Sequence, residues 1–313
     1  MAESHPVYLS PSELGTKEYW ETYYARTLAH ISHEKPAEDS DSDADVNDED
    51  DPGTSWFSEH NAPQKVLRFL TRGSFPLART KTSASVLDLG TGNGSMLALL
   101  RKRGGYRGRL VGVDYSRQSV ELARELQRVK GHSAYHSDSE DEDEDEDEDA
   151  EGEEQAEAQP EPEPESENGA GSETPIQFEE WDILGSKAGL SETGLGGVVP
   201  NESLSWFPYG DGGFDVVLDK GTFDAVSLAD DAKTSRVCER YPDIARRLVK
   251  RGGFLIVTTC NWTEEELVHW FTGDRTSGDR LTVWGRVEYP VFRFGGHEGQ
   301  GVCTVCFQRV GDA

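Results

Sequence analysis

From residue 83 to its end, the sequence alternates between short apolar runs and segments with helical periodicity. Such an alternation builds a sheet of mostly parallel strands with helices packed on both of its faces. The last two apolar runs follow one another without a helix, so we expect these strands to pair antiparallel. We therefore predict an α/β fold, a doubly wound, mostly parallel seven-stranded sheet with an antiparallel C-terminal strand pair. The expected strands cover residues 83–90, 109–115, 175–184, 214–221, 253–262, 281–296 and 301–310, and the expected helices include 95–104, 116–131, 241–253 and 263–271.

Acidic residues concentrate in two segments of the chain. Residues 34–51 hold ten acidic residues and one lysine, and residues 138–173 hold twenty acidic residues and no basic one. Segments this polar cannot bury enough apolar surface to offset the entropy lost on ordering. We therefore expect a helical N-terminal lid segment over 1–33, a disordered insertion over 34–54, and a domain over 55–313 that a second disordered insertion interrupts at 137–173. Two interpretations of the longer insertion stay open, a solubilising loop and a docking site for a basic partner.

The rest of the composition argues against several classes of function. Outside the two acidic segments, acidic and basic residues are equal in number, so we expect no nucleic-acid partner. No apolar run reaches about 18 residues, so we expect no membrane insertion. Four cysteines are too few for a disulfide framework, and Cys303 and Cys306 fall on opposite faces of a strand pattern, so we expect no metal site. We expect a monomer in the cytoplasm, with the nucleus as a second location.

Polar or aromatic residues end five of the expected strands. In open α/β sheets, ligands bind at the carboxyl ends of the strands, near the point where the strand order reverses. This regularity is the strongest functional signal in the chain, because every one of these ends would face the same site. The residues at the strand ends are Asp88 with the glycines that follow it, Asp114, Trp181 with Asp182, Asp219 with Lys220, and Asn261 with Trp262.

The stretch VLDLGTGNGSML, residues 86–97, has a glycine at every second position after its aspartate. Glycines at Gly90, Gly92 and Gly94 allow a tight turn and let a ligand approach the main chain. A dinucleotide site would need G-x-G-x-x-G, but position 95 is serine, and a pyrophosphate gains nothing from a neighbouring carboxylate. Asp88 suits a cationic ligand better. The alternatives are a dinucleotide and a tight turn without a ligand.

The pattern D-x-G-x-G-x-G, followed by an acid at the end of the second strand, resembles the S-adenosylmethionine site of class I methyltransferases. The resemblance implies a Rossmann-like methyltransferase fold. It assigns Asp88 and the glycine loop to the amino-acid moiety of this cofactor and Asp114 to the ribose hydroxyls. It gives Trp181 and Asp182 to the adenine. The cofactor-binding residues that we predict are Asp88, Gly90, Thr91, Gly92, Asn93, Gly94, Asp114, Tyr115, Trp181, Asp182, Asp219, Trp20, Trp56 and Phe57.

Four further stretches narrow the resemblance to one group of enzymes. SELGTKEYWETYYARTL (12–28), SWFSEH (55–60), DKGTFDAVSL (219–228) and TTCNWTEEEL (258–267) are similar to the fungal and animal protein-lysine methyltransferases that modify elongation factor 1-alpha. The resemblance covers nearly all of the chain outside the insertions, from Ser12 to about Arg309. The family's WFG reads WFS here, with Ser58 in place of glycine. The chain lacks the Asn/Asp-Pro-Pro-aromatic motif of nucleobase methyltransferases.

The resemblance implies a protein-lysine N-methyltransferase that uses S-adenosylmethionine and acts on elongation factor 1-alpha. A lysine ammonium must lose a proton before it can attack, so we predict that Asp219 orients it, with Asn261 and Trp262 bordering the acceptor. For Asp219 the alternative is a cap on the helix that follows, and for Asn261 a strand cap. We expect Lys220 to point away from the site or to pair with an acid, Asp224 being the candidate.

The aromatic residues of the N-terminal segment have two interpretations. Tyr19, Trp20, Tyr23 and Tyr24 would either pack a helix on the domain or form a lid that lines the lysine channel, and Trp56 and Phe57 face the same choice. Two other functions stay open for the whole chain. One is a methyltransferase for a small-molecule amine, and the other is a non-catalytic adaptor of the same fold, with vesicle traffic as its setting.

Overall fold

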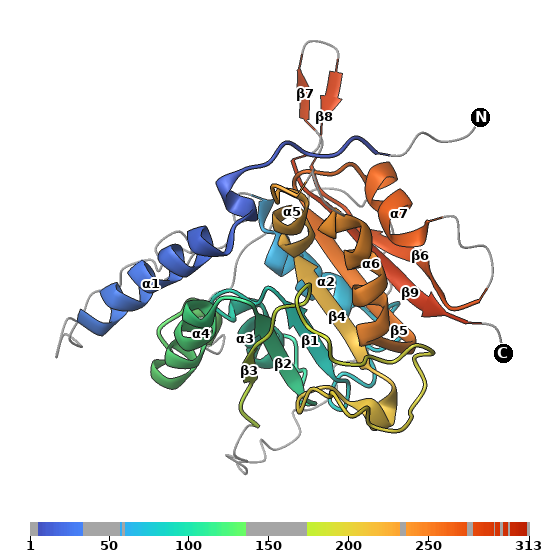
Figure 1. The fold of residues 1–313 in the computed structure, drawn as a ribbon, viewed down its shortest axis with the longest axis horizontal. Helices are drawn as coiled ribbons and strands as arrows, with labels where there is room; N and C mark the ends of the chain where they lie inside the picture. Colours follow the sequence, from blue (N-terminus) through green and yellow to red (C-terminus); the bar gives the residue numbers. More distant parts are fainter. Residues whose placement is uncertain are drawn as a thin grey trace, which may run out of the picture.

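The computed structural model describes residues 6–33, 57, 60–135, 174–231, 236–273, 278–290, 292–294, 297–299 and 301–311. The two predicted acidic insertions, 34–54 and 137–173, lie entirely outside the described residues. At the centre is a sheet whose strands run in the order β3-β2-β1-β4-β5-β9-β6 (Figure 1). Its five parallel strands are β1 (Val86–Leu89), β2 (Leu110–Asp114), β3 (Gln177–Glu180), β4 (Phe214–Lys220) and β5 (Val249–Thr259).

The C-terminal strands complete the sheet in antiparallel orientation. β9 (Cys303–Val310) pairs with β5 on one side and with β6 (Arg280–Val287) on the other. The prediction of a doubly wound, mostly parallel seven-stranded sheet with an antiparallel C-terminal pair is therefore confirmed. The strand order reverses between β1 and β4, which places the ligand site predicted for such sheets at the ends of these two strands.

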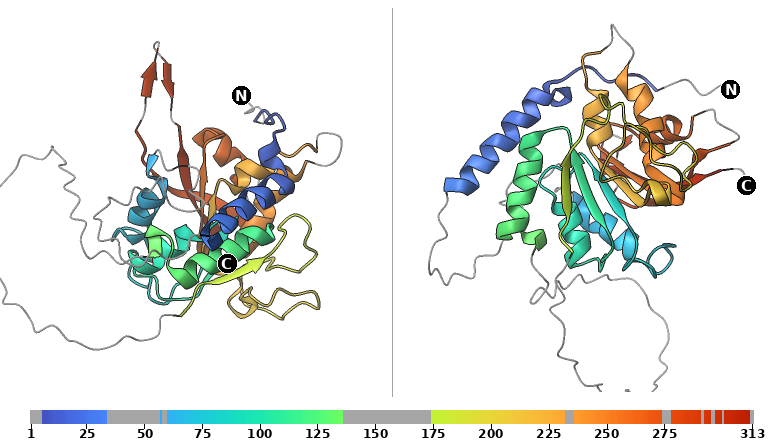
Figure 2. Two further views of the ribbon diagram at one scale, coloured as in Figure 1. Left: turned by 90° about the vertical axis from the view of Figure 1, so that its left-hand side faces the viewer. Right: turned by 60° about the horizontal axis from the view of Figure 1, so that its bottom comes forward.

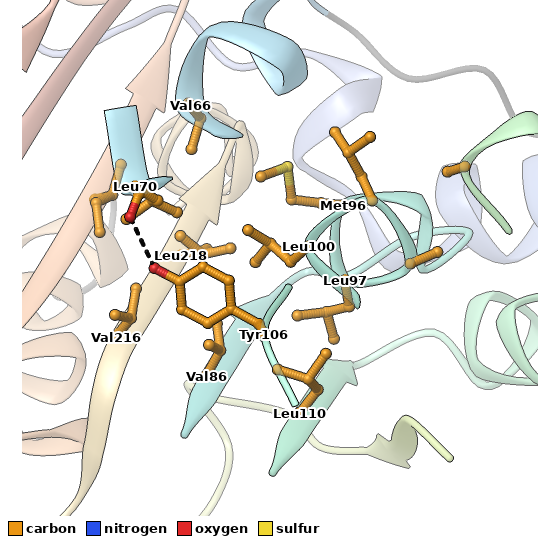
Figure 3. Packing of buried hydrophobic residues seen from close by; sticks show 14 of the residues in the cluster. Val66, Leu70, Val86, Met96, Leu97, Leu100, Tyr106, Leu110, Val216 and Leu218 are labelled. Carbon is orange, nitrogen blue, oxygen red and sulfur yellow. Dashed lines mark hydrogen bonds between the residues drawn. The ribbon is translucent and has the colours of Figure 1, made fainter. Parts of the chain in front are cut away.

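Helices cover both faces of the sheet. One face packs against α2 (Ala62–Thr71), α3 (Ser95–Lys102) and α4 (Arg117–Val129), and the other against α5 (Thr222–Ser227), α6 (Val237–Leu248) and α7 (Glu264–Thr272). The alternation of side chains along each strand divides the core in two: Val86 packs on the first face and Leu87 on the second. In the first core, the buried hydroxyl of Tyr106 donates to the Leu70 carbonyl at 3.1 Å (Figure 3).

The N-terminal helix α1 (Lys17–His33) lies against α4, outside the sheet and its covering helices (Figure 2). A short 3-10 turn, Glu13–Gly15, precedes it and is tied to the domain by the Ser12 amide, which donates to the Leu228 carbonyl at 3.0 Å. Two more 3-10 turns, Ser133–Tyr135 and Tyr209–Asp211, lie in the connections on either side of β3. None of the helices that the structure describes is both long and apolar enough to cross a membrane.

Several element boundaries differ from the sequence prediction, and two of these differences have a clear physical cause. The expected strand 281–296 is not continuous: β6 ends at Val287, and the chain then forms a separate hairpin of β7 (Phe292–Phe294) and β8 (His297–Gly299). Pro290, which has no amide hydrogen to continue the ladder, lies between them. The expected helix 241–253 starts earlier, at Val237, and ends at Leu248, because the buried Val249 already pairs with Phe214 as the first residue of β5.

Arg309 on β9 is fully buried and joins several segments that are distant in sequence. Its guanidinium donates to both carboxylate oxygens of Asp279, at 2.8 and 2.5 Å, and to the carbonyl of Val249 at 2.5 Å. It also donates to the carbonyls of Ser191 and Glu192, at 3.0 and 2.9 Å. One buried cation therefore fixes the long connection before β4 against the C-terminal half of the sheet.

We predict that Arg309→Leu lowers the free energy of unfolding by about 2–4 kcal/mol, because it removes the donor to the carbonyls of Val249, Ser191 and Glu192 and leaves Asp279 with Arg246 as its remaining guanidinium partner. Urea denaturation followed by circular dichroism measures this loss. As a control, Arg117→Leu removes only an exposed ion pair with Glu121 and should leave the denaturation midpoint unchanged. Equal midpoints for Arg309→Leu and the unmodified protein would contradict this account of Arg309.

Candidate functional site

A cavity opens at the carboxyl ends of β1, β2, β3 and β4, where the sequence predicted the ligand site. Three structures form its wall: the loops after these strands, the inner side of α1, and the start of α5 with the segment that follows it. The residues predicted to bind the cofactor that lie on the wall are Trp20, Gly90, Thr91, Gly92, Asn93, Asp114, Tyr115, Trp181 and Asp182.

Asp114 ends β2 and holds the glycine loop in place. One carboxylate oxygen accepts from the Gly92 amide at 3.1 Å and from the Ser119 hydroxyl at 2.8 Å. The other accepts from the Ser116 amide at 2.9 Å. Burial raises the pKa of Asp114 to about 6, although these hydrogen bonds oppose the shift. A carboxylate fixed in this way at the cavity wall has further lone pairs with which it can accept hydrogen bonds from hydroxyl groups.

The glycine loop is shaped by positive φ angles that other residues rarely adopt. Gly90 has a φ of 60°, and a Cβ atom there would lie 2.2 Å from the hydroxyl oxygen of Thr222. That hydroxyl donates to the Leu89 carbonyl at 2.6 Å, so the first turn of α5 packs directly on the loop. Gly94, also predicted to contact the cofactor, caps α3 and packs beneath the wall against Phe178.

Asp88 lies behind the loop and not on the cavity wall. Only 3% of its surface is exposed, and it accepts a hydrogen bond from the Thr91 hydroxyl at 2.8 Å. Burial raises its pKa to about 6, while this hydrogen bond and the charge of Lys220 oppose the shift. The sequence predicted direct contact between Asp88 and a cationic ligand. The structure instead gives Asp88 a role in shaping the loop through Thr91.

Lys220, the last residue of β4, lies on the cavity wall. It was predicted to point away or to pair with an acid. It does not point away, and the candidate acid, Asp224, instead accepts from the Thr259 hydroxyl and from the Cys260 amide. Burial lowers the pKa of Lys220, and the carboxylates that oppose this shift are Asp88 and Asp219. Strand register explains why the Asp88 carboxylate lies near Lys220. Asp88 lies opposite Leu218 in the ladder, so its side chain is on the same sheet face as that of Lys220.

The segment after β3 supplies an aromatic and an acidic group. Trp181 is buried against Trp206, with ring centroids 5.1 Å apart, and its indole nitrogen has no acceptor in the part of the chain that the structure describes. Asp182 is exposed on the wall, where one of its oxygens accepts from the amides of Leu184 and Gly185 at 3.0 and 2.9 Å. This end of the cavity therefore carries an aromatic residue and a fixed carboxylate.

Helix α1 closes the cavity with aromatic side chains. Trp20, Tyr23 and Tyr24 lie on the wall, where the Trp20 indole donates to the Leu14 carbonyl at 2.8 Å. Glu21 fixes the helix, since its carboxylate accepts from the Ser116 hydroxyl and from the amides of Arg117 and Gln118 at the N-terminus of α4. A negative charge at that helix end is favourable. Of the two interpretations of these aromatics, the lining of the site fits Trp20, Tyr23 and Tyr24.

Asp219 follows the helix-cap alternative. It is fully buried, and one of its carboxylate oxygens accepts from the amides of Thr222 and Phe223 at the start of α5, at 2.9 and 3.1 Å. The other oxygen accepts from the Tyr241 hydroxyl at 2.7 Å. Burial raises its pKa to about 7. Asp219 does not lie on the cavity wall, so this geometry fits a residue that positions α5 and not one that touches an acceptor lysine.

The other predicted catalytic residues also lie away from the cavity wall. Trp262 is buried between Phe223 and Trp270 in the second core, and Asn261 is exposed at the end of β5. Phe57, predicted to bind the cofactor, is buried, and the Lys220 ammonium lies 5.7 Å from its ring centroid. Trp56 falls outside the described residues.

The residues on the wall fit S-adenosylmethionine. The carboxylate of Asp182 suits the exocyclic amine of an adenine, and Trp181 contributes an aromatic residue to the same end of the wall. The Asp114 carboxylate suits ribose hydroxyls, and the glycine loop contributes Gly90 and Gly92 to the wall. A pyrophosphate fits poorly, because two of the three charged side chains on the described wall are the carboxylates of Asp114 and Asp182.

Comparison with known proteins identifies a methyltransferase domain and similar protein-lysine methyltransferases. A family model described as a methyltransferase domain matches residues 80–150. The protein-lysine N-methyltransferase EFM4 of Saccharomyces cerevisiae is 32% identical over 303 residues, which cover 96% of this chain and 96% of that protein. The protein-lysine N-methyltransferase efm4 of Schizosaccharomyces pombe is 28% identical, with 96% and 95% covered. The human EEF1A lysine methyltransferase 2 is 26% identical, with 96% and 88% covered.

The pKa of Asp114 predicts how cofactor affinity depends on pH. Ribose hydroxyls donate to the ionised carboxylate, so affinity should be full above the pKa of about 6 and should fall below it. We predict that the affinity for S-adenosylhomocysteine, measured by calorimetry, drops about tenfold between pH 7.5 and pH 5. Asp114→Asn, which cannot titrate, should bind weakly at both pH values. The same pH dependence in that variant would contradict the assignment.

Proposed function

The chain belongs to the family of protein-lysine N-methyltransferases that includes EFM4 of Saccharomyces cerevisiae, and we propose that its substrate is elongation factor 1-alpha. The enzyme transfers the methyl group of S-adenosylmethionine to a lysine amine. The proposed substrate is supported by the human and mouse relatives, which are named EEF1A lysine methyltransferase 2 and match 96% of this chain. We further propose that the protein is a monomer and that it is located in the cytoplasm and also in the nucleus.

The observation that carries this function is the position of the cavity. It lies at the ends of β1 and β4, where the glycine loop and Asp114 can hold the donor, and α1 forms part of its wall. The similarity to EFM4 spans almost all of both proteins, so the helix that closes the site belongs to the shared length.

The described wall contributes alignment and desolvation to the reaction. S-adenosylmethionine supplies a methyl group on a positively charged sulfur, and the attacking amine must approach it in line at about 3–3.5 Å. A lysine ammonium has a pKa of about 10.4 in water and has no lone pair. The aromatic rings of Trp20 and Tyr23, together with Ala225 and Val226 of α5, would surround the amine with apolar surface. Such surroundings lower its pKa, so that the neutral, nucleophilic form becomes accessible.

We predict that the purified protein transfers labelled methyl groups to elongation factor 1-alpha isolated from cells that lack this enzyme. Mass spectrometry of the product should place the label on a lysine side chain. Asp114→Ala should reduce incorporation by about 100-fold or more, since it removes the clamp on the glycine loop together with the acceptor for ribose.

The controls separate the other functions. Free lysine should remain unlabelled, and its methylation at a rate similar to the protein's would favour an enzyme for small amines. The chain would be an adaptor if two results came together. Wild type and Asp114→Ala would both bind elongation factor 1-alpha, and wild type would label neither that factor nor any other protein in the lysate. Labelling of a different protein would overturn the proposed substrate, but the chain would still be a protein methyltransferase.

A further inference from the structure

Lys220 is the one cationic side chain on the cavity wall among the residues that the structure describes. The other two charged residues there, Asp114 and Asp182, are acidic. A methyl donor with a positively charged sulfur gains nothing from a nearby ammonium. The ligand carries a single negative group that such an ammonium can bind, the α-carboxylate of its methionine moiety.

The order of the strands tells which part of the ligand lies near Lys220. β3, β2, β1 and β4 are consecutive in the sheet, with neighbouring strands about 4.8 Å apart. Trp181 follows β3 and Asp114 ends β2, so these two groups hold the adenine and the ribose. The ribose lies between the adenine and the amino acid in the ligand. The amino-acid end must then extend toward β1 and β4, where Lys220 lies.

The groups around Lys220 act on its charge in opposite directions, because burial lowers its pKa while neighbouring carboxylates oppose that shift. A buried ammonium is costly unless other groups compensate its charge. Here the carboxylates of Asp88 and Asp219 favour the protonated state, and the ring of Phe57 lies 5.7 Å from the ammonium, within the range of a cation–π interaction. Asp88, which the sequence assigned to the ligand, thus acts behind Lys220. The site carries a cation at its wall with an acid beneath it.

We propose that Lys220 binds the α-carboxylate of the methionine moiety of S-adenosylmethionine. This assignment rests on the proposed function and adds a recognition residue to it. The ammonium attracts the carboxylate and repels the α-amino group, so it fixes which way the amino-acid end is turned. That orientation in turn sets the direction in which the sulfur presents its methyl group. Asp88 is a positioning residue in this scheme, because it acts through Lys220 and Thr91.

Binding of two ligands to matched variants tests the proposal without any measurement of activity. The ligands are S-adenosylhomocysteine and its decarboxylated analogue, in which an aminopropyl group replaces the amino-acid side chain. Calorimetry gives the affinity of each for wild type, Lys220→Met and Lys220→Arg. Lys102→Met, at the far end of α3, serves as a surface control. If Lys220→Met does not fold by circular dichroism, Lys220→Gln takes its place.

Lys220→Met should bind S-adenosylhomocysteine about 10- to 100-fold more weakly than wild type, as expected for the loss of a charged hydrogen bond. It should bind the decarboxylated analogue as well as wild type does, or more tightly because the repulsion is gone. Lys220→Arg should retain much of the wild-type preference for S-adenosylhomocysteine over its decarboxylated analogue. An equal loss for both ligands, or no loss for either, would overturn the assignment. Failure of the wild-type protein to bind S-adenosylhomocysteine would overturn the proposed function itself.

Discussion

The whole site depends on the fixed carboxylate of Asp114 at the end of β2. It accepts hydrogen bonds from the glycine loop after β1 and from the first turn of α4, so it joins two successive strand–helix units at one point. A carboxylate buried to this degree is costly unless donors surround it. Those donors are main-chain amides and a serine hydroxyl, which the fold supplies without any ligand. The loop is therefore shaped before a cofactor binds.

A second set of contacts connects the N-terminal helix to this centre. Glu21 of α1 binds the same first turn of α4 that Asp114 binds from the other side, and both residues contact Ser116. The aromatic wall on α1 is thus positioned by the element that also holds the glycine loop. Shifts of α1 would change the acceptor side of the cavity and leave the sheet intact. The donor site therefore depends on the sheet and the glycine loop, whereas the aromatic part of the wall depends on α1.

Sequence reasoning located the site but assigned some of its residues to the wrong positions. The strand alternation and the glycine spacing were sufficient for the sheet and for the cavity, because both follow from local periodicity and from the direction of parallel strands. They could not show which of the acids at the strand ends reaches the wall. Asp219 is turned into the start of α5 by two amides and by Tyr241, a residue 22 positions away. Lys220 is the next residue of β4, so its side chain lies on the sheet face opposite to that of Asp219, and Lys220 lies on the cavity wall.

Other residues depended on contacts that no local pattern contains. Trp262 is an aromatic residue at a strand end, where it could stack on a ligand. Its ring partners Phe223 and Trp270 come from α5 and α7, however, and place it in the core. Nothing around Glu21 in the sequence marks it as the anchor of α1, because its donors lie about 95 residues further along the chain. The cysteine pair of β9 was interpreted correctly: Cys303 and Cys306 lie in different cores, as strand alternation requires.

A crystal structure of the protein with S-adenosylhomocysteine tests the central claim most directly. The account predicts that the ribose hydroxyls lie within hydrogen-bonding distance of the Asp114 carboxylate, with the adenine against Trp181 and the amino-acid end at β1 and β4. A ligand bound in the reverse direction, or one whose ribose does not contact Asp114, would contradict it.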